Sequence, residues 1–89
     1  MNTVILNTRL SFCCGASDKV YDVQLIKTIG GNFMLRAEWG RRGKAMRSQV
    51  KGVFAPSLNL TEWDAKRAFH NLVASKVNKG YSITESHTV

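Results

Sequence analysis

Residues 39–44, with the sequence Trp-Gly-Arg-Arg-Gly-Lys, have the side chains best suited to binding a polyanion. An indole can stack on a base, which stabilises binding by about 1–3 kcal/mol per base. The guanidinium groups of Arg41 and Arg42 can hold phosphate through paired hydrogen bonds, whereas Lys44 offers a point charge. These residue types predict a contact with nucleic acid. Trp39 also alternates in phase with Phe33, Leu35 and Ala37, and this alternation by itself predicts that Trp39 lies in the core.

Two further groups of residues extend this basic character. Arg47, Gln49 and Lys51 alternate along the next predicted strand, so we expect them to share its polar face. Arg47 and Lys51 would lengthen a stripe of phosphate contacts there. A second candidate surface has the spacing of one helix face and comprises Trp63, Lys66, Arg67 and His70. A helix face that is merely solvated has the same pattern.

No combination of residues points to catalysis. His70 is expected on the solvent side of a helix and His87 near the C-terminus, and neither belongs to a Ser–His–Asp set or a metal-ligand spacing. Cys13 and Cys14 are adjacent, which strains a disulfide between them and supplies zinc ligands at one point only. We expect two reduced thiols on opposite faces of a strand. The sequence therefore predicts no enzyme, no metal, no cofactor and no small-molecule substrate.

Composition favours one small domain with an anionic partner. The chain has 89 residues, with 13 Lys and Arg against 6 Asp and Glu, and a net charge of +7. Such a length allows a single domain with a thin core, and a basic surplus is typical of nucleic-acid binding. Many small proteins are basic without such a partner. There is no run of about 18 apolar residues to span a membrane, and residues 1–10 do not resemble a signal peptide. We therefore expect a cytoplasmic protein.

The patterns of apolar residues predict the elements that would position these side chains. Apolar and polar residues alternate in four segments, which are 4–14, 20–29, 33–39 and 45–54. Turn clusters at 15–19, 30–32 and 40–44 separate them, and such short connections predict an antiparallel meander. Residues 62–79 follow a helical period, with Thr61 and Asp64 in capping-box positions and Gly80 just after the last turn.

The helix and the strands are expected to bury their apolar faces against each other. The helix stripe comprises Ala65, Ala68, Phe69, Leu72, Val73 and Val77. The apolar side of the sheet is expected to include Ile29 of the second strand and Met46 and Val50 of the fourth, with polar residues on the other side. The result is an α+β fold, a sheet of four to five strands with one helix packed across one face. Residues 83–89 are expected to form a tail, and those just after Tyr81 could add an edge strand.

The chain resembles the WGR domain, a module of DNA-dependent poly(ADP-ribose) polymerases that also occurs as a stand-alone protein in bacteria. The resemblance covers residues 19–82 within a single domain. It rests on the aromatic-led segment 20–25, on Trp39-Gly40-Arg41 with Gly43, and on Ala65, Phe69, Lys76 and Gly80-Tyr81. Arg42 stands where the family often has an apolar residue, Met46 stands where it often has a second glycine, and loop 55–60 is longer than usual.

The resemblance implies a sheet crossed by a helix and a role in DNA recognition. In the polymerases the domain helps to recognise DNA ends and relays that contact to neighbouring domains. Trp39 would then stack beside a terminal nucleotide, and Arg41 would contact phosphate or another domain. We expect a module that binds the DNA backbone or DNA ends, in preference to RNA, with little sequence specificity. Its expected contacts are Trp39, Arg41, Arg42, Lys44, Arg47 and Lys51. The alternative is a protein–protein module that acts with a partner subunit or as a homodimer.

Overall fold

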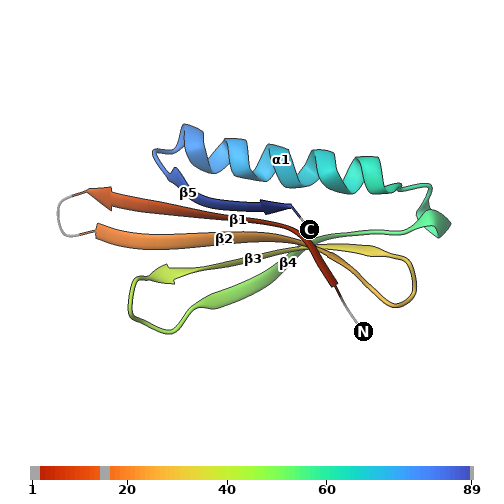
Figure 1. Ribbon diagram of the computed structural model, residues 1–89, viewed down its shortest axis with the longest axis horizontal. Coiled ribbons are helices and arrows are strands. Elements are labelled where there is room, and N and C mark those ends of the chain that lie inside the picture. Colours follow the sequence, from red (N-terminus) through yellow and green to blue (C-terminus); the bar gives the residue numbers. More distant parts are fainter. Residues whose placement is uncertain (1–2, 15–16, 89) are drawn as a thin grey trace.

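A computed structural model describes residues 3–14 and 17–88 of the chain. Five antiparallel strands form one sheet, and α1 (Glu62–Asn78) lies along one face of it (Figure 1). The strands are β1 (Thr3–Cys14), β2 (Ser17–Lys27), β3 (Phe33–Arg41), β4 (Arg47–Phe54) and β5 (Ser82–Thr88), and a 3-10 turn, Pro56–Leu58, precedes the helix. The expected α+β fold with one helix across the sheet is confirmed. Within the described residues, no helix has the length and apolar character to cross a membrane.

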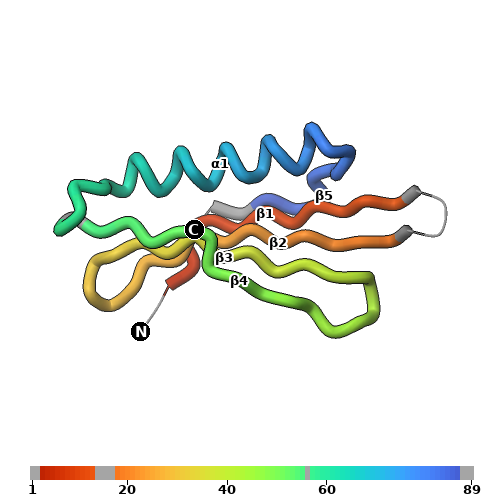
Figure 2. Tube along the Cα trace, turned by 180° about the vertical axis from the view of Figure 1, so that it is seen from behind, coloured from red at the N-terminus to blue at the C-terminus, as the bar shows by residue number. Residues whose placement is uncertain are grey.

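The sheet has the order β4-β3-β2-β1-β5. The first four strands form the predicted meander, and the chain then crosses the sheet through α1 and returns to the far edge beside β1 (Figure 2). The edge strand expected just after Tyr81 is therefore present as β5, and it extends through residues 83–88, which were expected to form a tail. Residues 17–19 of the predicted turn also belong to a strand, paired with the end of β1. Residues 15–16 and 89 lie outside the described part.

α1 packs on one side of the sheet, the covered face, and leaves the other side, the open face, without a covering element among the described residues. Leu10, Val23 and Leu25 of the covered face are fully buried. Phe69 of the helix packs in the same core and is only 2% exposed. This apolar contact between helix and sheet dominates the stability of the domain.

Ile29 and Val77, which their spacing assigned to the core, lie outside it. Ile29 is 79% exposed because β2 ends at Lys27 and Ile29 lies in the following turn. Val77 is 42% exposed because each step of four residues rotates a helix by about 40° beyond a full turn. After Phe69 and Val73, the position that faces the sheet is therefore Lys76.

Local capping signals set both ends of α1. The Thr61 backbone N–H donates to the Asp64 carboxylate at 2.8 Å, and the Asp64 backbone N–H donates to Thr61 Oγ1 at 3.4 Å, which is the predicted capping box. At the other end Gly80 has φ +106°, and the Tyr81 N–H donates to the Lys76 carbonyl at 3.1 Å. This reversal directs the chain from the helix to β5 and places Tyr81 at the end of the sheet.

The expected orientation of β4 is wrong. Arg47 pairs with Trp39 and Gln49 pairs with Ala37, and directly paired residues share a face of the sheet. Arg47 and Gln49 therefore lie on the covered face, while Val50 lies opposite Arg36 on the open face and is 47% exposed. An edge strand that the helix covers only in part can expose apolar residues on one side and basic residues on the other.

Other residues also depart from the expected division into an apolar and a polar face. Met46, which precedes β4, is 36% exposed. On the open face Val20 and Ile26 are buried at 7% and 6% exposure, so this face is not uniformly polar.

Candidate nucleic-acid interface

Trp39 lies where the core ends. Its ring stacks on Tyr21, its partner in β2, with the ring centroids 6.0 Å apart and the planes 19° from parallel. The side chain is half-buried, and the Lys51 ammonium lies 5.1 Å from the ring centroid. Trp39 therefore lies only partly in the core, because one side of the indole packs on the core and the other side lines a surface cleft.

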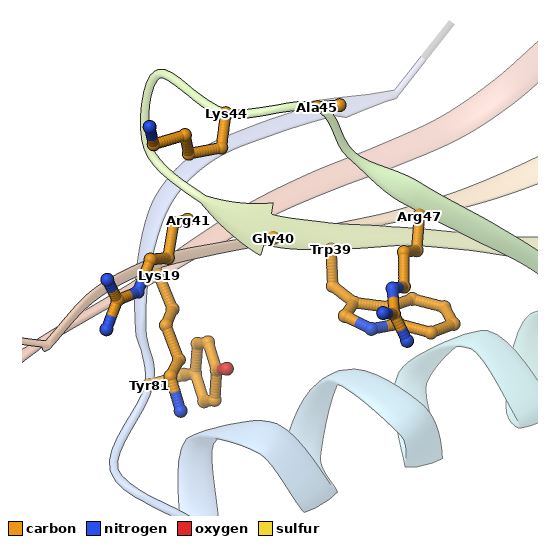
Figure 3. A pocket seen from close by; sticks show the side chains of 8 residues that line it. All are labelled: Lys19, Trp39, Gly40, Arg41, Lys44, Ala45, Arg47 and Tyr81. Carbon is orange, nitrogen blue, oxygen red and sulfur yellow. The ribbon is translucent and has the colours of Figure 1, made fainter.

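A cleft of about 420 Å³ opens beside Trp39 (Figure 3). The strands β1 and β2 extend past the end of α1, so the helix leaves this end of the covered face open (Figure 2). The cleft residues come from β2, β3, the β3–β4 turn, β4 and the segment after the helix. They are Lys19, Trp39, Gly40, Arg41, Lys44, Ala45, Arg47 and Tyr81.

The turn between β3 and β4 positions two of the cations. Gly43 has φ +79°, a conformation that favours glycine, and the Lys44 N–H donates to the Arg41 carbonyl at 3.0 Å. This tight turn brings Arg41 and Lys44 to the same rim of the cleft, although they are three residues apart in the chain.

A smaller pocket of about 240 Å³ adjoins the cleft and shares Trp39 and Tyr81 with it. Its other lining residues are Tyr21, Lys51 and Lys76. The Lys76 ammonium lies 4.5 Å from the centroid of the Tyr21 ring, a cation–π contact. Burial lowers the pKa of Lys76, and the positive charges of Lys79 and Lys51 lower it further.

Acidic residues do not line either pocket; among the described residues they lie elsewhere. On the open face, Arg9 donates to both carboxylate oxygens of Asp22 at 2.8 and 2.9 Å. Arg36 pairs with Glu38 on the same face. At the start of α1, Glu62 pairs with Lys66 and Asp64 caps the helix. The cations around Trp39 have no carboxylate neighbour in these two pockets and can attract an external anion there. Arg41 and Lys44 also line a third pocket, on the open face, which contains Asp22 and Glu38.

The model of the WGR domain family matches residues 6–88, which is nearly the whole chain. The chain belongs to the WGR domain family. The match is longer than the segment 19–82 that the motifs suggested, because it includes β1 and β5. No curated protein and no solved structure shows a significant match. The WGR domain is a nucleic-acid binding module.

In this WGR domain the structure gathers most of the sequence-predicted contacts around one indole. Arg41, Lys44 and Arg47 line the cleft with Trp39, and Lys51 lines the adjoining pocket. Arg42 is the exception. Its guanidinium donates to the Asp18 carboxylate at 3.2 Å on the open face, and it lines neither pocket.

Four residues of the site were missed by sequence reasoning. They are Lys19, Tyr21, Lys76 and Tyr81. Tyr21 and Tyr81 approach edge to face with their centroids 6.0 Å apart, although 60 positions separate them in the chain. Only the pairing of β2 with β3 and the crossing of α1 bring these residues to Trp39. The available signal was the position of Tyr21, Lys76 and Tyr81 within the family motif; Lys19 had none.

The second basic-aromatic surface lies on the outer side of α1. Trp63 is 65% exposed, and the Arg67 guanidinium lies 5.4 Å from its ring centroid. Lys66 and His70 are exposed on the same helix. Cys13 is a free, exposed thiol, whereas the side chain of Cys14 lies outside the described part.

Proposed function

We propose that this WGR domain is a non-catalytic module that binds DNA through its backbone or ends, with little sequence preference, in the cleft beside Trp39. The main support is the combination of a half-exposed indole with cations in two adjoining pockets whose described lining contains no carboxylate. Arginine and lysine side chains recognise phosphates regardless of sequence, whereas sequence readout needs side chains placed in a groove against base edges. DNA is favoured over RNA because of the family's role in the polymerases.

The non-catalytic part of the proposal is supported by the lining of the cleft. Its ionisable side chains are lysines, arginines and Tyr81, without a histidine, a cysteine or a carboxylate among the described lining residues. General acid–base catalysis near neutral pH normally uses such groups. The two cysteines of the chain are adjacent and ill suited to a disulfide with each other, so we propose a cytoplasmic location for the domain.

Binding can be tested by fluorescence anisotropy with labelled blunt duplex, overhung duplex and single-stranded DNA at low and high salt. Arg47→Gln and Arg42→Gln form a matched pair, because both remove an exposed arginine at the same end of the sheet but from opposite faces. Loss of one charged hydrogen bond costs about 1.5 kcal/mol, so Arg47→Gln should weaken binding about tenfold. Arg42→Gln should bind as the wild type does.

Trp39→Ala is expected to weaken binding as well, and circular dichroism must confirm that it folds, because Trp39 also packs on Tyr21. Absence of binding at low salt would refute the proposal, and so would equal losses in Arg47→Gln and Arg42→Gln.

A second candidate function is a protein–protein module, with a partner subunit or a second copy of the chain. The observation in its favour is Trp63, which is 65% exposed on the outer side of α1. Tryptophan is enriched among the residues that dominate binding energy in protein interfaces. Analytical ultracentrifugation of wild type and Trp63→Ser would reveal self-association through this surface, and a monomer at high concentration in both would exclude the homodimer.

A further inference from the structure

The aromatic side chains Trp39 and Tyr81 separate two sets of cations. On one side, in the larger cleft, lie Lys19, Arg41, Lys44 and Arg47. On the other side, in the smaller pocket, lie Lys51 and Lys76. In Figure 3 the rings of Trp39 and Tyr81 lie apart along the cleft, with Arg47 beside Trp39 and Lys19 beside Tyr81. A ligand seated against these rings therefore meets positive charge on both sides.

The smaller pocket has the properties of an anion site in its own right. Each of its two ammonium groups lies near an aromatic ring, Lys51 near Trp39 and Lys76 near Tyr21. Its described lining contains no carboxylate. The pKa of Lys76 is lowered by burial and by neighbouring positive charges, so a negative group placed there would relieve an unfavourable interaction.

The shape of the site restricts which part of a nucleic acid can occupy it. The larger cleft, of about 420 Å³, is in the size range of about 300–1,000 Å³ that is typical of small-molecule sites, so it suits one nucleotide rather than a double helix. A base inside a duplex is stacked and paired, and it must leave both contacts before it can lie on an indole. An unpaired base meets no such cost, and its nucleoside carries a phosphate on each side along the strand.

We propose that the site holds an unpaired nucleotide inside a continuing single strand, with its base against Trp39 and Tyr81, one phosphate in the larger cleft and the next phosphate between Lys51 and Lys76. This inference rests on the proposed function and specifies its substrate class. The domain then prefers single-stranded DNA, or the unpaired stretch of an overhang, to a blunt duplex end. Stacking on the aromatic side chains is tolerant of base identity, which agrees with little sequence preference.

The test compares a labelled single strand with a blunt duplex of the same length in anisotropy titrations at low salt. Wild type is expected to bind the single strand about tenfold more tightly or better, since only a continuing strand brings a second phosphate between Lys51 and Lys76. The double variant Lys51→Gln/Lys76→Gln should bind the single strand with nearly the affinity that it has for the duplex. The matched control is Lys27→Gln/Lys66→Gln, which removes two exposed lysines outside both pockets and should retain the preference.

Photocrosslinking gives a second measurement that needs no variant. A single strand with 5-iodouracil at an internal position should crosslink to the aromatic residues at least as well as one with the label at its terminus. The inference fails, while the proposed function stands, if wild type binds strand and duplex equally, if both double variants behave alike, or if only the terminal label crosslinks. If neither DNA binds at low salt, the proposed function fails together with the inference.

Discussion

Removing Lys51 and Lys76 is expected to lower the salt dependence of single-strand binding by a predictable amount. Four cations line the larger cleft and two line the smaller pocket, which makes six in the described residues. Each phosphate that is neutralised in a single strand contributes about −0.7 to the slope of log K against log salt, so the two phosphates held by these two sets of cations give a slope of about −1.4. Loss of the phosphate site between Lys51 and Lys76 leaves a slope of about −0.7 by the same rule.

These slopes translate into measurable affinities. Between about 50 and 200 mM salt, wild type should lose about sevenfold in affinity, and Lys51→Gln/Lys76→Gln should lose about threefold. Arg42→Gln should keep the slope of the wild type, because its charge is paired with Asp18 at 3.2 Å on the open face. The assay is a series of anisotropy titrations at four or more salt concentrations, with folding checked by circular dichroism.

Two results would refute this reasoning. A wild-type slope near zero would mean that these cations neutralise neither phosphate. An unchanged slope in the double variant, together with a reduced slope in Arg42→Gln, would place the phosphate contacts on the open face and not around Trp39.

Further predictions concern stability and are tested by thermal or urea denaturation. Thr61→Ala should lower the free energy of unfolding by about 1 kcal/mol through loss of the helix cap, and an unchanged midpoint would contradict this role. Hydrogen bonds from Thr61 lower the pKa of Asp64 below its ordinary value of 3.8. The ionised Asp64 carboxylate therefore stabilises the folded state at pH values above 3.8, and this stabilisation is lost as the pH falls through the lowered pKa of the folded state. Asp64→Asn should remove this part of the acid dependence. Gly80→Ala should cost about 1–2 kcal/mol, because φ is +106° and the new Cβ would lie 3.0 Å from Phe12 Cε2. An unchanged free energy of unfolding in Gly80→Ala would contradict this and show that the turn accommodates the new side chain. Phe69→Ala should cost about 3–5 kcal/mol, since the ring is 2% exposed in the core, and a loss below that of Thr61→Ala would argue against the core as described.

Sequence patterns were sufficient for the order and type of the elements. The alternation in residues 4–14 and 33–39 is a period-two signal, and the Thr61–Asp64 box and Gly80 mark the ends of α1. Such signals depend on neighbours within a few positions, so they can be recognised without tertiary structure. The family motif around Trp39 was likewise visible in the sequence, and the family match confirms it.

The sequence did not allow us to predict which residues of β4 lie on which face of the sheet. In β4 both alternating sets contain residues that a half-exposed strand accepts, so the pattern does not say which set faces the helix. Pairing with β3 decides this, because Arg47 lies opposite Trp39. A bulge opposite Leu35 and Arg36 then leaves Lys51 as an extra residue between Val50 and Gly52, with its ammonium near the Trp39 ring.

The sequence by itself determined that this chain is a basic α+β domain of the WGR type with a Trp-Gly-Arg segment at the end of a strand. Only the tertiary structure decided which charges surround that segment. Lys19, Lys76 and Tyr81 reach Trp39 from β2, from α1 and from the turn after it, while the adjacent Arg42 pairs with Asp18 on the opposite face. The physical reason is that side chains of consecutive strand residues point to opposite faces, whereas pairing and crossing connections bring distant residues onto the same face.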